Sequence, residues 1–300
     1  MENFTKALYI LLLVLLGTTF ASCGGESDGD EPDVPGGGST SDTGVKVKVF
    51  DIKDVPVRMI LVEGGTFRMG AAPEQTQSGM KVLDDEYPVH NVTLSTFYLA
   101  EFEITSGLWD AVMSGKEYTG YGDEDKPETG SWEDFDNFIA ELNRQTGYNF
   151  RMPTEAEWEY AARGGRYSKG YVYPGSNYHD EVAWNYRNSG DSHLSEVEWN
   201  WWTMRGNNCR RHVAGQLKPN ELGLYDMGGN VDEWCSDLYG PYSRLDQTNP
   251  TGAEPGSTTY HVSRGGSYAH FSNESRCSHR RGNPPSEEVY WGGRLAMDAK

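Results

Sequence analysis

The sequence predicts an α+β fold with few helices, short strands and much irregular structure. The 300-residue chain contains 36 glycines, which point to a loop-rich architecture rather than a helical bundle. Few stretches combine a capping residue with apolar residues at helical spacing, and many short apolar runs lie between Gly, Asn and Pro residues. Hydrophobic residues make up 36% of the chain and aromatic residues 12%, so most of it can fold, as one large domain or two small ones.

The expected strands come first in the folded part. Residues 45–49 alternate apolar and charged side chains, as an edge strand does. Residues 59–70 contain two apolar runs separated by Gly64 and Gly65, which predicts a strand, a turn and a second strand. Residues 89–100 alternate again and predict further strand structure.

Three helices are expected, each beginning after a hydroxyl side chain that can accept a backbone hydrogen bond. Thr105 precedes a short helix, Ser131 a longer one and Thr154 a third. Asp134 and Glu157 stand three residues after Ser131 and Thr154, so both of these helices should start with a capping box.

The first 22 residues are typical of a secretory signal peptide. Lys6 precedes an apolar run over residues 7–16, and small residues follow before Cys23. The run is too short to span a bilayer as a stable helix. The approach to Cys23 resembles a bacterial lipobox, in which the cysteine is lipidated, although Phe20 departs from the usual aliphatic residue. A soluble secreted protein cut near Ser22 is the alternative.

Residues 23–44 are rich in Gly, Ser, Asp, Glu and Pro and cannot bury enough apolar surface to fold, so we expect a flexible tether. Its acidic residues close to Cys23 resemble the surface-export signal of lipoproteins in the Bacteroidetes, although a solvated linker is the simpler explanation. We therefore expect a cell-envelope protein, lipid-anchored in the outer membrane and displayed on the surface. The folded domain is expected over residues 45–300.

The formal net charge of -19 limits the classes of molecule that we expect this protein to bind. Such a surface repels nucleic-acid phosphates and anionic membrane surfaces, so a nucleic-acid role is not expected. Solubility explains the acidity most simply, and cation binding is the alternative.

Six segments in a fixed order carry a family resemblance. They are MILVEGGTFRMG (59–70), EYPVHNV running on to FYLAEFEIT (86–105), FRMPTEAEWEYAARGG (150–165), LGLYDMGGNVDEW (222–234), VSRGGSY (262–268) and GGRL (292–295). Together they resemble the formylglycine-generating enzyme, or sulfatase-modifying factor, family over about residues 55–298. The resemblance implies that family's compact, atypical C-type-lectin-like fold.

The resemblance also implies an activity, but this chain departs from the family at the decisive positions. Active members oxidise a substrate cysteine to formylglycine with oxygen and a copper ion held by two cysteines, because soft thiolates suit Cu(I). Here His270 stands at the first cysteine position and Ser275 near the second, where this chain is a few residues shorter. Cys277 resembles the family's later, structural cysteine. Copper and formylglycine synthesis are therefore not expected.

Calcium is the cofactor that the resemblance implies for this chain, because hard oxygen ligands on a glycine-rich loop suit Ca²⁺. The stronger site has four ligands: Asp226, the carbonyl groups of Gly229 and Val231, and Glu233. The weaker site has two, Asn185 and the carbonyl group of Tyr186, with Asp191 as the candidate acidic ligand. For both loops the alternative is a turn held by hydrogen bonds between side chains and the backbone.

The chain has four cysteines, and an oxidising envelope favours disulfides among those that are not lipidated. Three remain after Cys23, so one thiol stays free or pairs externally. Cys235 and Cys277 lie on the two family segments nearest the expected core and are the favoured pair, which leaves Cys209. Connectivity cannot be derived from the sequence.

These observations favour a non-catalytic binding or assembly protein that recognises a glycan, a peptide or a protein. The stretch 177–212 contains Trp184, Trp199, Trp201 and Trp202 among polar residues, which suits ligand binding, although a place in the core is the simpler expectation. Some family members in the Bacteroidetes are structural parts of gliding or secretion machinery, which is a second binding role. The competing hypothesis is a metal-dependent oxidoreductase of the formylglycine-generating type, acting on protein cysteine with altered ligands.

Overall fold

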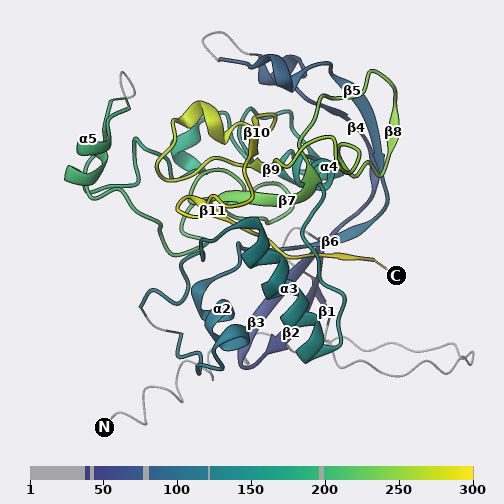
Figure 1. Ribbon diagram of the computed structural model, residues 1–300. Helices are drawn as coiled ribbons and strands as arrows, with labels where there is room; N and C mark the ends of the chain where they lie inside the picture. The colour runs from purple at the N-terminus through teal and green to yellow at the C-terminus, as the bar shows by residue number, and fades with distance from the viewer. Residues whose placement is uncertain (1–37, 41–43, 77–80, 121, 196–198, 300) are drawn as a thin grey trace, which may run out of the picture. The chain divides into compact units, whose positions relative to one another are not determined.

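The computed structural model describes residues 38–40, 44–76, 81–120, 122–195 and 199–299 (Figure 1). The predicted signal peptide, Cys23 and most of the predicted tether lie outside these residues. The described part of the chain forms three β-sheets and four α-helices joined by long irregular segments. The predicted α+β class, with few helices and short strands, is confirmed. No helix in this described part is both long enough and apolar enough to cross a bilayer.

The largest sheet is antiparallel and has the strand order β1-β2-β3-β6-β12. Its strands are β1 (Gly38–Thr40), β2 (Lys46–Ile52), β3 (Val55–Val62), β6 (Phe97–Ala100) and β12 (Ala296–Asp298). The predicted strand at residues 45–49 is confirmed as β2, but it is not an edge strand, because β1 pairs beyond it. Strand β1 lies within the predicted tether: strand pairing uses backbone hydrogen bonds, so a Gly-Ser-Thr segment needs no apolar surface to join a sheet.

Two smaller sheets complete the domain. One has the order β10-β9-β7-β11 and contains β7 (Asp232–Leu238), β9 (His261–Arg264), β10 (Arg280–Asn283) and β11 (Trp291–Gly292). The other has the order β4-β5-β8 and contains β4 (Gly65–Met69), β5 (His90–Leu94) and β8 (Gln247–Thr248). The strand–turn–strand prediction for residues 59–70 is confirmed, but β3 and β4 belong to different sheets.

The helices are α2 (Ser106–Met113), α3 (Trp132–Thr146), α4 (Glu155–Ala162) and α5 (Trp201–Gly206). Thr105, Ser131 and Thr154 cap the first three as predicted, and the two capping boxes form. Five short 3₁₀ helices lie at Pro73–Gln75, Asp84–Glu86, Gly165–Tyr167, His179–Glu181 and Ser272–Ser275. Helix α5 was not predicted; Asn200 caps it.

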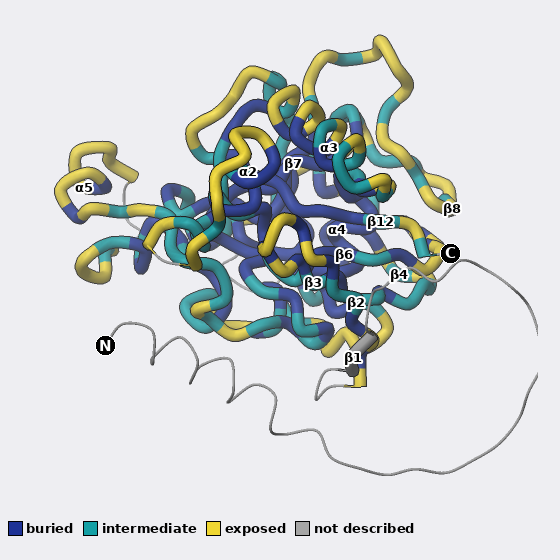
Figure 2. The backbone as a smooth tube through the Cα atoms, turned by 90° about the horizontal axis from the view of Figure 1, so that it is seen from below, coloured by how far each residue is buried: buried dark blue, intermediate teal, exposed yellow. Residues whose placement is uncertain are grey.

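Buried stretches of the chain lie in the interior of the domain (Figure 2), and their apolar side chains form two main clusters. In one, α2 and α3 pack with the five-stranded sheet around Phe135 and Phe138. In the other, α4 contacts strands of the two smaller sheets around Trp158. All eight residues of α4 are buried, which explains why this helix shows no one-sided apolar stripe.

Buried ion pairs tie these parts together. Four arginine side chains are at most 2% exposed: Arg264, Arg276, Arg280 and Arg294. Each pairs with a buried glutamate, as Arg276 does with Glu86 at 2.5 Å and Arg294 with Glu233 at 2.6 Å. These four arginines thus hold the fold together, because a buried charge is tolerated only when it is paired.

Candidate functional site

His270, which the family resemblance assigns to the first thiolate position, lies on the loop that follows β9. Gly265 and Gly266 have φ values of +96° and +68°, a conformation that favours glycine, and they turn the chain out of the strand. The Tyr186 amide donates to the His270 carbonyl at 2.8 Å, and the Tyr268 amide donates to the Asn230 carbonyl at 2.9 Å. These two backbone hydrogen bonds hold the segment that carries the imidazole in place.

The imidazole forms an ion-pair contact with Asp232 of β7. Its Nδ1 atom lies 3.0 Å from Asp232 Oδ2, and the carboxylate also accepts hydrogen bonds from Gly266 N and Ser263 Oγ. Burial alone would raise the pKa of Asp232, but the hydrogen bond and charge of His270 lower it. Burial lowers the pKa of His270, against the raising effect of Asp232.

The partners of His270 make opposite demands on Nδ1. Asp232 can only accept and favours a proton on Nδ1, whereas the Ser267 amide can only donate and lies 3.1 Å from the same nitrogen. On the other side of the ring, Arg281 Nη1, which can only donate, lies 3.3 Å from Nε2. Arg281 also pairs with Glu274, so the imidazole lies among acidic and basic side chains.

Ser267 is not arranged as a nucleophile beside His270. The Oγ and backbone amide of Ser267 both lie 3.1 Å from His270 Nδ1, the nitrogen that also faces Asp232. A serine–histidine–aspartate triad needs the serine on one ring nitrogen and the aspartate on the other. The His270–Asp232 pair could not be predicted from the sequence, because the two residues lie on different segments that only the tertiary fold brings together.

Ser275 lies apart from this pair, in the short helix Ser272–Ser275. Its Oγ is buried and has no hydrogen-bond partner among the described residues, and its backbone packs beside Gly228. The two residues that the resemblance assigns to the cysteine positions are thus a paired imidazole and an isolated hydroxyl. Neither group supplies the thiolates that hold Cu(I).

The thiols of the described region are Cys209, Cys235 and Cys277, and all three are free. The predicted disulfide between Cys235 and Cys277 is not formed. Both side chains pack in the apolar cluster around Trp158, and Cys277 Sγ faces the Ala162 carbonyl of α4 at 3.8 Å. Burial raises the pKa of Cys277 to about 12 and that of Cys235 well above its usual range, so both stay protonated and unreactive.

The loop of the stronger predicted calcium site is buried and tightly turned. Asp226 and Gly229 have φ values of +53° and +75°. Asp226 Oδ2 accepts from the Gly215 amide at 2.7 Å, whereas Oδ1 is buried and has no hydrogen-bond partner within the described part of the chain. Both oxygens of Glu233 are engaged, with Arg294 and with Trp158 Nε1 at 2.8 Å.

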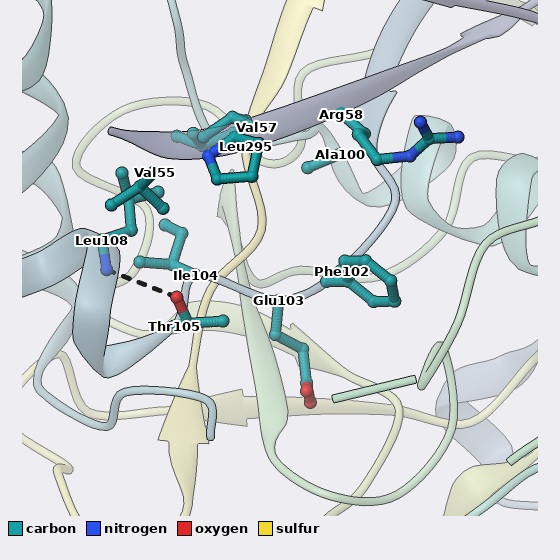
Figure 3. A pocket seen from close by; sticks show the side chains of 11 residues that line it. Val55, Val57, Arg58, Ala100, Phe102, Glu103, Ile104, Thr105, Leu108 and Leu295 are labelled. Carbon is teal, nitrogen blue, oxygen red and sulfur yellow. Dashed lines mark hydrogen bonds between the residues drawn. The ribbon is translucent and has the colours of Figure 1, made fainter. Parts of the chain in front are cut away.

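A third carboxylate, Glu103, joins this loop and was missed from the sequence. It accepts from Asn230 Nδ2 at 2.8 Å and from the Val231 amide at 3.2 Å. Figure 3 shows its carboxylate pointing away from the apolar wall of a hollow of about 50 Å³. An acidic residue between two apolar ones in the FEIT segment is the signal that could have indicated it.

The acidic charge of this loop favours a bound cation, but its oxygen atoms are not arranged as a complete set of ligands. Burial raises the pKa of Asp226 to about 6 and that of Glu103 well above its usual range, and Arg294 is the basic group near both. The free Asp226 Oδ1 suits a cation, but Glu233 is already bound to Arg294. Among the described residues, no three His, Cys, Asp or Glu side chains converge as a metal site.

The weaker predicted calcium loop forms a turn in the structure. Asn185 Oδ1 accepts from the Arg187 amide at 3.0 Å, and its amide group lies 3.1 Å from His179 Nδ1. Asp191 pairs with Arg210 at 2.9 Å. These contacts match the alternative of a turn held by side-chain hydrogen bonds, and calcium at this loop stays a prediction.

The tryptophans of the 177–212 stretch divide into two groups. Trp184 is half-buried and stacks on His212 with a ring separation of 3.8 Å. The other three are exposed at or beside α5, which projects from the body of the domain (Figure 1): Trp199, Trp201 and Trp202. The simpler expectation of a core position is therefore wrong for these three. Trp199 Nε1 donates to the Ala269 carbonyl, which links α5 to the His270 loop.

Comparison with known proteins identifies the family to which this chain belongs. Residues 47–299 match the family described as "Sulfatase-modifying factor enzyme 1-like domain". The chain belongs to this sulfatase-modifying factor family, as the six segments predicted.

The relatives carry different names. "Chaperone protein LppX" of Paenibacillus barcinonensis is 33% identical over 74% of this chain and 82% of its own length. The formylglycine-generating enzyme of Streptomyces coelicolor is 35% identical over 50% of this chain and 47% of its own. "Serine/threonine-protein kinase Pkn1" of Chlamydia trachomatis serovar L2 is 29% identical over 85% of this chain, which spans only 41% of that kinase.

Solved structures support the fold. "Treponema denticola variable protein 1" has a TM-score of 0.66 at 24% identity, covering 84% of this chain and 99% of its own. PvdO from Pseudomonas aeruginosa has the same TM-score at 23% identity, covering 84% of this chain and 98% of its own. At such identities the likeness bears on the fold alone. It agrees with the predicted fold of the sulfatase-modifying factor family.

Proposed function

We propose that this chain is a non-catalytic member of the family: a lipid-anchored protein of the cell envelope, in the outer membrane and surface-exposed, that binds a protein, peptide or glycan partner. The observation that carries the proposal is the state of His270. Its imidazole replaces a metal-binding thiolate and is held between Asp232 and Arg281.

This arrangement argues against a copper oxidase with altered ligands. The ring nitrogen that could bind a metal, Nε2, faces the Arg281 guanidinium at 3.3 Å. A metal ion bound there would lie next to a positive charge and would have to displace it, at a cost that rises in a partly buried site. The buried thiols Cys235 and Cys277 are protonated and are not alternative ligands.

The exposed tryptophans support a binding role. Trp202 is 74% exposed and Trp199 44%, and Arg205 stacks over Trp201 at 5.2 Å. Large amphipathic rings with few rotatable bonds suit sugar or peptide recognition, because little conformational entropy is lost on binding. The name of the Paenibacillus relative, a chaperone, is consistent with partner binding. The acidic surface argues against nucleic acid.

A structural calcium ion remains part of the proposal at the stronger loop. Asp226 would supply its unpaired Oδ1, and the carbonyl groups of Gly229 and Val231 would complete the oxygen set, with Glu233 only if Arg294 moved. The ion would stabilise the loop and perform no chemistry.

Two measurements separate the binding role from the oxidase alternative. Metal analysis by mass spectrometry should find no stoichiometric copper after purification with added Cu(I), and a cysteine-containing peptide should cause no oxygen uptake. Stoichiometric copper with peptide oxidation would overturn the proposal. A formylglycine-generating enzyme prepared in parallel is the positive control.

The partner and the anchor need tests of their own. Glycan and peptide arrays probed with the wild-type protein and Trp202→Ala should give hits that the variant loses. Cells expressing the chain with an alkyne-labelled fatty acid should yield a labelled protein, and Cys23→Ser should not be labelled. Labelling that persists in this variant would refute the lipid anchor.

A further inference from the structure

A cavity of about 140 Å³ is bordered by β5, the end of β7 and the segment after β7. Its polar lining includes Asp237, Glu155, Arg280 and His90. Its apolar lining consists of Met69, Ala156, Leu238, Pro241, Pro250 and Ala253. Neither His270 nor the calcium loop contributes to it.

Most of the charged groups here satisfy one another. Glu155 binds Arg280 through both carboxylate oxygens, each at 2.7 Å, and Tyr242 donates its hydroxyl to the same carboxylate at 3.1 Å. Arg280 also donates to the Gly240 carbonyl at 2.8 Å. Glu155 and Arg280 therefore neutralise each other and leave no unpaired charge for a ligand.

Asp237 is the exception. It is 3% exposed, and no basic side chain pairs with it in the described structure. Its Oδ2 accepts from the first amide of α4, that of Glu155, and from Ser236 Oγ. Both hydrogen bonds that the described residues make to this carboxylate go to Oδ2, which leaves Oδ1 free, and the side chain lines the cavity. A buried carboxylate in this position carries an uncompensated charge, which is costly.

His90 supplies a second unused polar atom. It is 6% exposed, and its Nδ1 lies 3.0 Å from the Pro88 carbonyl, which can only accept. The ring proton therefore lies on Nδ1, and Nε2 is left as an acceptor with no partner in the described residues. Both unused polar atoms of this cavity are thus hydrogen-bond acceptors, one of them anionic.

We propose that this cavity binds an alkylammonium group, with Asp237 as its counter-ion, His90 Nε2 as a second acceptor and the apolar wall around its methylene chain. An ammonium supplies several N–H donors and one positive charge, which matches two acceptors and one unpaired negative charge. The source is a lysine side chain of a partner or a free small amine. The site does not depend on whether His270 takes part in catalysis.

Binding should strengthen as the pH rises through neutrality. Burial and the neighbouring Glu155 raise the pKa of Asp237 to about 7, against its hydrogen bonds from the Glu155 amide and Ser236. Glu157, also on α4, raises it further. The other charged and titratable groups of the cavity are Arg280 on β10, which is neutralised by Glu155, His90 on β5 and Tyr242.

The test is calorimetric titration of the chain without its signal peptide at pH 8. The probes are n-butylammonium, the uncharged isostere n-butanol, and an acetyl-Gly-Lys-Gly-amide peptide. We expect butylammonium to bind and butanol not to bind. Asp237→Asn should weaken binding by about 30-fold or more, as loss of one partner of a buried charge pair does. Tighter binding of the peptide than of butylammonium assigns the source to a protein lysine, and the reverse assigns it to a free amine.

The controls keep the proposal falsifiable. Asparagine retains an oxygen for the Glu155 amide, so Asp237→Asn should fold, which circular dichroism checks. Asp54→Asn, on an exposed turn, should bind as the wild type does. If Asp237→Asn does not fold, His90→Phe should still weaken binding several-fold. Equal binding of butanol, unchanged binding in Asp237→Asn, or an Asp237-dependent response to Ca²⁺ or Mg²⁺ instead of the amines would overturn the proposal.

Discussion

Replacing Asp226 by asparagine should stabilise the metal-free protein at neutral pH. Burial raises the pKa of Asp226 from its ordinary value of 3.8 to about 6. When folding raises the pKa of a carboxyl group, its bound proton stabilises the folded state. This stabilisation is full at a pH below the pKa of the unfolded state and is lost as the pH rises through the pKa of the folded state. The shift corresponds to a penalty of about 3 kcal/mol above pH 6 for the ionised side chain.

Asparagine removes this charge but keeps an oxygen that can accept from the Gly215 amide. We therefore expect Asp226→Asn to raise the free energy of unfolding by about 1–3 kcal/mol at pH 7.5 in a chelator, and to change it little at pH 4.5. Urea unfolding followed by tryptophan fluorescence measures both values.

Calcium should reverse the order of the two proteins. At a calcium concentration of 100 times the dissociation constant, the wild type should gain about 2.7 kcal/mol, because the ion binds only the folded state. The variant lacks the charged ligand and should gain far less. Destabilisation of Asp226→Asn in chelator at pH 7.5 would refute the argument from burial. A full calcium response in the variant would refute Asp226 as a ligand.

Three further changes test other parts of the molecule. Arg276→Met leaves Glu86 buried and unpaired and should lower the free energy of unfolding by about 3–5 kcal/mol, with partial recovery when Glu86→Gln is added, as urea titration can show. Iodoacetamide at pH 8 should not modify Cys235 or Cys277 in the native protein, and a disulfide between them in a non-reducing peptide map would contradict their buried, protonated state. Trp202→Ala should change unfolding stability by less than about 0.5 kcal/mol, because the side chain is exposed, while partner binding on the array falls.

The sequence predicted what depends on local chemistry. The caps at Thr105, Ser131 and Thr154 follow from a hydroxyl and the backbone amide three residues on, so no distant contact is needed to see them. Strand β1 and helix α5 escaped prediction for the opposite reason. Both are too short to carry a periodic apolar pattern.

The site was predictable only through the family resemblance, and only in part. That resemblance identified His270 as the residue in the thiolate position, but not that Asp232, 38 residues earlier in the printed sequence, would hold it. Glu103 and Asp237 were missed because burial defines their role. An acidic residue looks alike in sequence whether it is solvated or enclosed. The favoured disulfide failed because nearness to a shared core does not orient two sulfur atoms toward each other.

The charge balance of the core links the proposals. Nine acidic side chains are buried in the described structure: Glu86, Glu103, Glu155, Glu157, Glu159, Asp226, Asp232, Glu233 and Asp237. Six of them pair with an arginine or a histidine.

The three without such a partner are Glu103, Asp226 and Asp237, and they fall in two places. Glu103 and Asp226 share the predicted calcium loop, and Asp237 lines the cavity. An unpaired buried carboxylate must take up a proton or a cation, because leaving it ionised and alone costs several kcal/mol. The same physical imbalance therefore supports a metal ion at one place and an ammonium group at the other. Because Glu233 already pairs with Arg294, the structure supports calcium binding at this loop less strongly than the sequence does.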